Sequence, residues 1–269
     1  MSTQNHNALF DALWNDYLAI TPDAKAIHEE FKALGDDTII NDHIALRTFN
    51  EGAMNLENIG KHLEQFGYEA AGEYHFEEKK LYAKHFQHKT DEDAPKIFVS
   101  ELLLEEFSAE LQMFCRGLIA EANWNIRQNG LSLPSRPWGK VTREAYERLL
   151  EESEYAAWLA AFGLRANHFT VSVNKLKGMK NIEAVNEFLK DKGFELNTSG
   201  GEIKGNEEVC LKQSSTMANI VDWEFNGGKH PIRTCFYEFA ERFPMENGEL
   251  YHGFVAASAD KIFESTNAA

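Results

Sequence analysis

Two stretches of this 269-residue chain repeat one another, and this repeat limits the possible folds more than any other feature. The run Asp42-His43-Ile44-Ala45-Leu46 has a counterpart in Asn167-His168-Phe169-Thr170-Val171. A predicted helix follows each run and ends at a glycine, Gly67 or Gly193, at nearly the same distance from the histidine. About three predicted strands come next in both copies. The sequence therefore predicts a duplicated strand–helix–three-strand module.

Helical spacing of apolar residues dominates the rest of the sequence. It covers residues 7–35, before the first copy, and residues 105–163, between the copies. Because no Gly/Ser-rich linker separates these segments, we expect the copies to pack together. The predicted fold class is α+β, with paired βαβββ modules at 40–104 and 164–244, added N-terminal and central helices, and a single compact domain over 1–269.

Composition argues against several classes of partner. The 43 Asp and Glu residues outnumber the 27 Lys and Arg, and the formal net charge of −16 opposes binding to nucleic acid or anionic lipid. No stretch approaches the roughly 18 apolar residues of a membrane span. The three cysteines, Cys115, Cys210 and Cys235, form no Cys-x-x-Cys pair and indicate a reducing compartment. We expect a cytoplasmic monomer or homodimer that binds a small molecule, with no nucleic-acid or membrane partner.

The repeat also brings two histidines into equivalent positions. Successive side chains of a strand point to opposite faces, so His43 and His168 each lie opposite the apolar face of their strand. If the copies pair about an approximate two-fold axis, the two imidazoles converge in one cleft beside Glu238 of the closing strand. Two imidazoles and one carboxylate form the facial triad of non-haem Fe(II) oxygenases. Glu101, matched to Glu238 in the first copy, is a candidate fourth ligand, which would favour Zn(II), Ni(II) or Co(II) isomerase chemistry.

Further polar residues are candidates for contacts with substrate. Arg47 shares a strand face with His43 and can hold an anionic group beyond the metal. Gln213 and Ser215 share a face of their own strand and are candidate lining groups. Each of these side chains also has a structural interpretation, as a hydrogen-bonded core residue or a surface ion pair. Three histidines lie in an acidic, lysine-rich hairpin region and are expected to be exposed: His75, His85 and His88.

Several of these motifs together resemble one known family. They are Asp42-His43-Ile44-Ala45-Leu46-Arg47, Asn167-His168-Phe169-Thr170, the run from Leu211 to Ala218, and Phe236-Tyr237-Glu238-Phe239-Ala240-Glu241-Arg242. The sequence resembles the hydroxyglutarate synthase family, 2-oxoadipate dioxygenase/decarboxylase, which is related to the vicinal-oxygen-chelate fold. The resemblance extends from the N-terminal helices to about Pro244.

The resemblance implies an Fe(II) enzyme of lysine catabolism. Its metal ligands map to His43, His168 and Glu238, and Arg47 matches the arginine that holds the substrate's carboxylate. The reaction implied is the oxidation of 2-oxoadipate by O₂, with loss of CO₂, to give 2-hydroxyglutarate. This chain is shorter than the family's long members and lacks a region that contributes to their substrate pocket, so a related 2-oxo acid is an alternative substrate.

Two other functions remain compatible with the residues. A glyoxalase-like isomerase or lyase would use Glu101 as an added ligand and general base, without consuming O₂. A metal-free binding module would use the histidines as ordinary pocket residues. Dependence on O₂ separates the first alternative from the oxygenase, and iron content separates the second.

Overall fold

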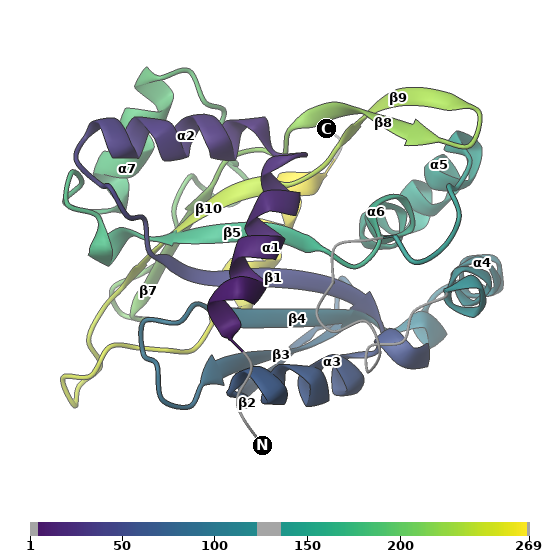
Figure 1. Ribbon diagram of the computed structural model, residues 1–269, viewed down its shortest axis with the longest axis horizontal. Helices are drawn as coiled ribbons and strands as arrows, with labels where there is room; N and C mark the ends of the chain where they lie inside the picture. The colour runs from purple at the N-terminus through teal and green to yellow at the C-terminus, as the bar shows by residue number, and fades with distance from the viewer. Residues whose placement is uncertain (1–4, 123–135, 268–269) are drawn as a thin grey trace.

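The computed structural model describes residues 5–122 and 136–267, and one eight-stranded sheet forms its centre (Figure 1). The strand order across the sheet is β2-β3-β4-β1-β5-β10-β7-β6. These strands are β1 (Asn41–Phe49), β2 (Tyr68–Phe76), β3 (Leu81–His88), β4 (Lys96–Leu102), β5 (Ala166–Ser172), β6 (Lys204–Asn206), β7 (Leu211–Ser215) and β10 (Phe236–Arg242).

The order of the strands reflects the sequence repeat. In each copy the first strand pairs in parallel with the last, β1 with β4 and β5 with β10. The two copies join through β1 and β5, which run antiparallel. Each copy places one helix after its first strand, α3 (Leu56–Leu63) or α7 (Ile182–Asp191). The structure thus confirms the predicted α+β fold of paired βαβββ modules.

The second module contains a hairpin that the repeat does not predict. Strands β8 (Ile220–Phe225) and β9 (Gly228–Arg233) form a separate two-stranded sheet between β7 and β10. The turn uses Gly227 and Gly228, whose φ angles of 112° and 139° favour glycine. This insertion lengthens the second module between strands that are adjacent in the first.

Helices before and between the modules occupy the ranges predicted to be helical. Residues 123–135 of the predicted central segment 105–163 lie outside the described residues. The remaining α-helices are α1 (His6–Leu18), α2 (Pro22–Ala33), α4 (Ala109–Glu121), α5 (Arg143–Glu152), α6 (Glu154–Phe162) and α8 (Ala256–Phe263). Short 3-10 turns lie at Gly52–Met54, Glu64–Phe66, Leu104–Glu106, Val173–Lys175 and Glu264–Thr266.

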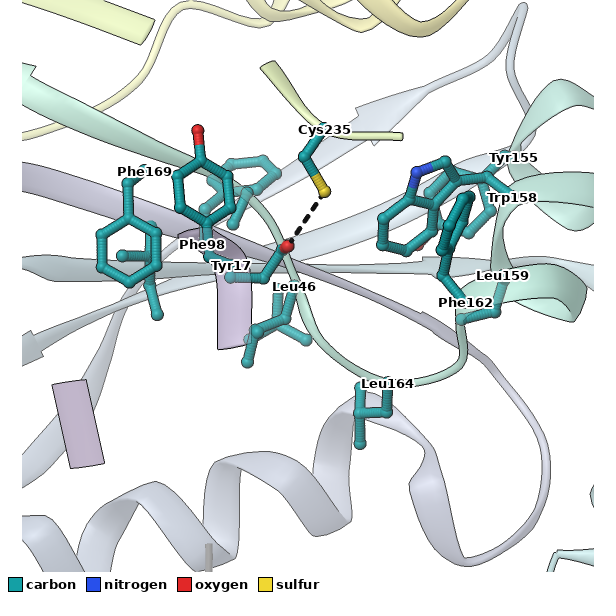
Figure 2. Packing of buried hydrophobic residues seen from close by; sticks show 14 of the residues in the cluster. Tyr17, Leu46, Phe98, Tyr155, Trp158, Leu159, Phe162, Leu164, Phe169 and Cys235 are labelled. Atoms are coloured by element: carbon teal, nitrogen blue, oxygen red, sulfur yellow. Dashed lines mark hydrogen bonds between the residues drawn. The ribbon is translucent and has the colours of Figure 1, made fainter. Parts of the chain in front are cut away.

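One face of the sheet packs against α1, α2, α3 and α7. Helix α1 crosses in front of β1 and β5 in Figure 1. Phe169 of β5 points to this side, because its ring centroid lies 5.0 Å from that of Tyr17 and 4.9 Å from that of Trp14. Figure 2 shows Tyr17 and Phe169 together in this core. The Cys235 thiol donates to the Ala166 carbonyl over 3.5 Å. The side chains next to Phe169 in the strand, including His168, must point to the opposite face.

The C-terminal segment packs on that opposite face. Helix α8 contacts β2 at one side of the sheet and β6 and β7 at the other, so the sheet must curl around it. The segment also reaches individual strand residues: Ser265 bonds with Ser215, and Thr266 with Arg47. We call residues 251–267 the C-terminal cover.

Across residues 5–122 and 136–267, no helix is both long enough and apolar enough to cross a bilayer.

Candidate metal centre

Three central strands bring together two imidazoles and one carboxylate. His43 lies on β1, His168 on β5 and Glu238 on β10, and all three side chains are buried. His168 Nε2 is 3.1 Å from Glu238 Oε2, and His43 Nε2 is 3.6 Å from Glu238 Oε1. One ligand atom from each residue lies within 4.8 Å of the other two. Within the described residues, no other group of three or more His, Cys, Asp or Glu side chains meets this condition.

Strand register accounts for this convergence. Thr170 of β5 pairs with His43 on one side and with Glu238 on the other, while His168 pairs with Ala45. Residues paired directly across neighbouring strands project to the same face. The three candidate ligands therefore share the face covered by the C-terminal segment, as strand alternation in the sequence predicts.

The neighbours of the histidines fix the direction of both rings. His43 Nδ1 donates to Asp42 Oδ1 over 2.8 Å, and His168 Nδ1 lies 3.3 Å from Asn167 Oδ1. Each bond leaves Nε2 as the atom that faces Glu238. Burial, and after it the electrostatic effects of His43 and Arg47, lowers the pKa of His168 well below its ordinary value. A neutral imidazole with a free lone pair is the form that binds a metal.

Glu238 has an unpaired oxygen at the centre of the group. Its Oε1 accepts from Gln213 Nε2 over 2.6 Å, whereas Oε2 forms no hydrogen bond with any described residue, even with His168 Nε2 close by. Burial raises the pKa of Glu238, although His43 acts in the opposite direction. A buried carboxylate oxygen that lacks a donor and faces two imidazoles is well suited to a divalent cation.

Arg47 is buried and already binds a carboxylate. Its Nη1 donates to both carboxylate oxygens of Glu154 over 2.9 and 3.2 Å, and its Nη2 donates to Thr266 Oγ1 over 3.0 Å. The guanidinium also lies over the rings of Tyr155 and Trp158, 4.9 and 5.0 Å from their centroids. Arg47 is therefore not an exposed surface arginine, and its fixed guanidinium can hold a carboxylate.

The two predicted lining residues are also on the covered face. Gln213 is buried and donates to the candidate ligand Glu238. Ser215 pairs with Glu238 across the strands and hydrogen-bonds to Ser265 of the C-terminal cover. Gln213 thus supports a ligand directly, while Ser215 contacts the cover.

Glu101 lies on the other side of the sheet, and the prediction of a fourth ligand there is wrong. Lys96 of β4 pairs with His43 just as Phe236 of β10 pairs with His168, so the counterpart of Glu238 is Phe98. Glu101 is an odd number of residues away from Phe98, which places it on the opposite face. Its carboxylate instead accepts from the backbone N–H of Leu56, at the start of α3, over 2.9 Å.

The prediction that His85 is exposed is also wrong. His85 is buried, and burial lowers its pKa to about 4. Its Nδ1 bonds with the Tyr74 hydroxyl over 2.9 Å, and its ring lies 5.2 Å from that of Phe254 in the cover. The polar sequence around His85 concealed this burial, because the residues that cover it come from the C-terminus. Of the other two histidines, His75 is exposed and His88 is half-buried.

Aromatic rings enclose the candidate centre. Phe254 of the cover meets the His43 ring edge-to-face at 4.8 Å, and Phe236 stacks on His168 at 4.6 Å. A surface pocket of about 350 Å³ lies beside Glu154, the partner of Arg47, and is also lined by Lys79, Phe263 and other residues. No sequence pattern predicts the contact between Glu154 and Arg47. By contrast, a polar acceptor precedes both histidines in the sequence, and this recurrence could have identified Asp42 and Asn167 as the partners of the two rings.

A duplicated βαβββ sheet defines a protein with a vicinal-oxygen-chelate-like fold, and two histidines and a glutamate on its inner face form a possible metal site. A glyoxalase-superfamily protein from Ralstonia eutropha JMP134 shares this fold, with 22% identity, a TM-score of 0.75, and coverage of 92% of this chain and 84% of the other. The sequence matches the family described as 2-oxoadipate dioxygenase/decarboxylase over residues 8–128 and 120–250. The chain belongs to this family of enzymes.

Named relatives agree with this assignment. The chloroplastic 2-oxoadipate dioxygenase/decarboxylase of Arabidopsis thaliana is 33% identical, over 93% of this chain and 74% of the other. The Oryza sativa hydroxyglutarate synthase, solved in complex with 2-oxoadipate, is 31% identical, with a TM-score of 0.88 and coverage of 96% and 91%. A Shewanella frigidimarina NCIMB 400 protein described as a hydrolase is 53% identical, with a TM-score of 0.87 and coverage of 96% and 100%.

Proposed function

We propose that this protein is an Fe(II)-dependent dioxygenase/decarboxylase of a 2-oxo acid. The proposed reaction converts 2-oxoadipate and O₂ into 2-hydroxyglutarate and CO₂. The observation that carries the proposal is the buried group of His43, His168 and Glu238, in a chain whose family is named for this activity. The Oryza sativa relative, solved in complex with 2-oxoadipate, supports the choice of substrate.

His43, His168 and Glu238 would hold the iron, or another divalent metal. When bound, iron supplies redox chemistry toward O₂ and a template for the 2-oxo acid. Gln213 keeps Glu238 in place through its hydrogen bond to Oε1, which leaves Oε2 for the metal. The rings of Phe254 and Phe236 exclude water from the histidines.

Arg47 would bind the carboxylate at the far end of the substrate. It shares the inner face of the sheet with His43, and its Nη1 donates to both oxygens of the Glu154 carboxylate. A substrate carboxylate offers the same two oxygens and would replace that of Glu154. The half-buried Glu154 borders the surface pocket, so it can turn outward as the substrate enters.

The isomerase alternative loses its structural basis. It depended on Glu101 as a fourth ligand and base, and Glu101 lies on the opposite face of the sheet.

The cytoplasmic location stays a prediction, and the Arabidopsis relative is chloroplastic.

Substitutions at the metal group and at Arg47 test the proposal through different readouts. His168→Ala should abolish both iron binding and turnover, because it removes one of three ligands. Arg47→Ala should retain iron but raise KM for 2-oxoadipate by about 30-fold, equivalent to about 2 kcal/mol for a charge-assisted contact. Its effect on 2-oxohexanoate, which has the same chain length but no distal carboxylate, should be much smaller.

Arg116→Ala provides the control, because this arginine also pairs with a glutamate, Glu51, but on the surface. It should leave iron binding and KM unchanged. Full iron occupancy in His168→Ala would contradict the proposed ligands. An equal loss for both substrates in Arg47→Ala would contradict the role of Arg47 in binding the carboxylate.

A further inference from the structure

We propose that Asp42, held by Arg242, is a positioning residue for the candidate metal centre. It fixes the ring of His43 so that Nε2 faces Glu238 and His168. This inference rests on the proposed metal-dependent function, and it assigns a role to two residues that bind neither metal nor substrate.

The contacts around Asp42 are short and buried. Its Oδ1 accepts from His43 Nδ1 over 2.8 Å and from Arg242 Nη2 over 2.8 Å, and its Oδ2 accepts from Arg242 Nε over 2.6 Å. The side chains of Asp42 and Arg242 are each 4% exposed. Because His43 Nδ1 is bonded to Asp42, Nε2 is the ring nitrogen left to face a metal. The Thr170 hydroxyl lies 3.1 Å from that Nε2.

The two histidines are supported unequally. Asn167 precedes His168 as Asp42 precedes His43, but its contact with Nδ1 is longer, at 3.3 Å, and its side chain is neutral. Strand register makes Leu102 of β4 the counterpart of Arg242 in β10, so the repeat does not supply Asn167 with an arginine. A fold that needed only a hydrogen-bond acceptor at this position could use asparagine in both modules. The buried Asp42–Arg242 pair therefore serves a requirement particular to His43.

Arg242 links this support to the C-terminal cover. Its Nη1 donates to the carbonyls of Tyr251 and Gly253 over 2.9 and 2.8 Å. The next residue, Phe254, meets the His43 ring edge-to-face, with 4.8 Å between the ring centroids. The same guanidinium thus holds both the carboxylate that orients His43 and the backbone that brings Phe254 onto it.

Titration of the metal-free protein with Co(II), followed by visible absorption, measures this role without relying on turnover. Asp42→Asn keeps an acceptor oxygen, as Asn167 does, and should weaken Co(II) binding about 10-fold. Asp42→Ala removes the acceptor and should weaken binding by up to about 100-fold, the range found when outer supports of metal ligands are removed. Asp36→Asn is the matched control, because Asp36 is also buried but accepts from the backbone of Lys177 and Gly178.

Thermal unfolding of the same metal-free variants separates positioning from a purely structural role. If Asp42→Asn and Asp42→Ala unfold at lower temperature but bind Co(II) as tightly as the wild type, the positioning role is refuted. If Asp42→Ala does not fold, Asp42→Asn/Arg242→Gln, which leaves no unpaired charge, takes its place and must also show weaker binding. Failure of the wild type itself to bind Co(II) would instead overturn the metal centre on which the inference rests.

Discussion

Replacing Glu154 with glutamine should make the enzyme bind its dicarboxylate substrate more tightly while making the fold less stable. In the structure Glu154 occupies both hydrogen-bonding positions of Arg47 Nη1 that the substrate carboxylate would need. A substrate must displace it before binding, so part of the binding free energy is spent on breaking an internal ion pair. Glutamine keeps the size of the side chain but removes the charge that competes.

The size of the effect follows from the exposure of the pair. The Arg47 side chain is 1% exposed and that of Glu154 is 20% exposed. Hydrogen bonds to charged groups contribute about 1.5–3 kcal/mol. We take the lower end because Glu154 is partly solvated and glutamine retains one acceptor. About 1.4 kcal/mol corresponds to a 10-fold lower KM for 2-oxoadipate. The free energy of unfolding should fall by about 1–2 kcal/mol, because Arg47 stays buried without its counter-charge.

The assay compares KM for 2-oxoadipate and urea unfolding in the wild type, Glu154→Gln and Glu151→Gln. Glu151 is an exposed residue of α5, and its substitution should change neither quantity. The opposite signs of the two effects make the test specific, since a merely damaged site would lose both stability and affinity. An unchanged or higher KM in Glu154→Gln, together with lower stability, would refute the competition between Glu154 and substrate.

Two further predictions concern residues that the sequence alone misplaced. Burial lowers the pKa of His85 from 6.5 to about 4. Between these two pH values, this histidine is protonated in the unfolded chain but stays neutral in the folded protein. The stability that this neutral histidine contributes is present above pH 6.5 and falls by about 2 kcal/mol by pH 5. Urea unfolding at pH 7 and pH 5 should show a loss about 2 kcal/mol smaller in His85→Gln than in the wild type, because other buried histidines such as His168 lose stability in both proteins. Equal losses in the two proteins would contradict the prediction. Glu101→Gln should keep its full metal content and lose about 1 kcal/mol of stability from the contact with Leu56, whereas metal loss would restore Glu101 as a ligand.

The sequence predicts the central part of the fold because the repeat and strand alternation are both local patterns. Asp42-His43 and Asn167-His168 mark equivalent strands, and alternation then decides which side chains share a face. These two rules bring His43 and His168 together without knowledge of distant contacts.

The same rules failed where strand register mattered. Matching Glu101 with Glu238 by similarity of their neighbours shifts the register by an odd number of residues, and an odd shift moves a side chain to the other face. The β8–β9 hairpin hides this error, because it lengthens the second module and leaves no common spacing to count.

Contacts from the C-terminus could not be predicted at all. The burial of His85 depends on Phe254, and the environment of Arg47 depends on Thr266, both far away along the chain. Helix α8 is a short amphipathic helix, and its sequence does not specify which surface it covers. The sequence therefore predicts that the three candidate ligands lie close together, whereas it does not predict which residues cover them.

The proposed function requires a metal held by His43, His168 and Glu238 and the oxidation of a 2-oxo acid by O₂. The most direct measurement is O₂ uptake, with CO₂ release recorded in parallel, when 2-oxoadipate is added to anaerobically Fe(II)-loaded protein that is then exposed to a known amount of O₂. We predict one O₂ consumed and one CO₂ released for each 2-hydroxyglutarate formed, and no uptake by His168→Ala. Bound iron without O₂ uptake, with 2-oxoadipate or any shorter 2-oxo acid, would refute the proposed oxygenase function.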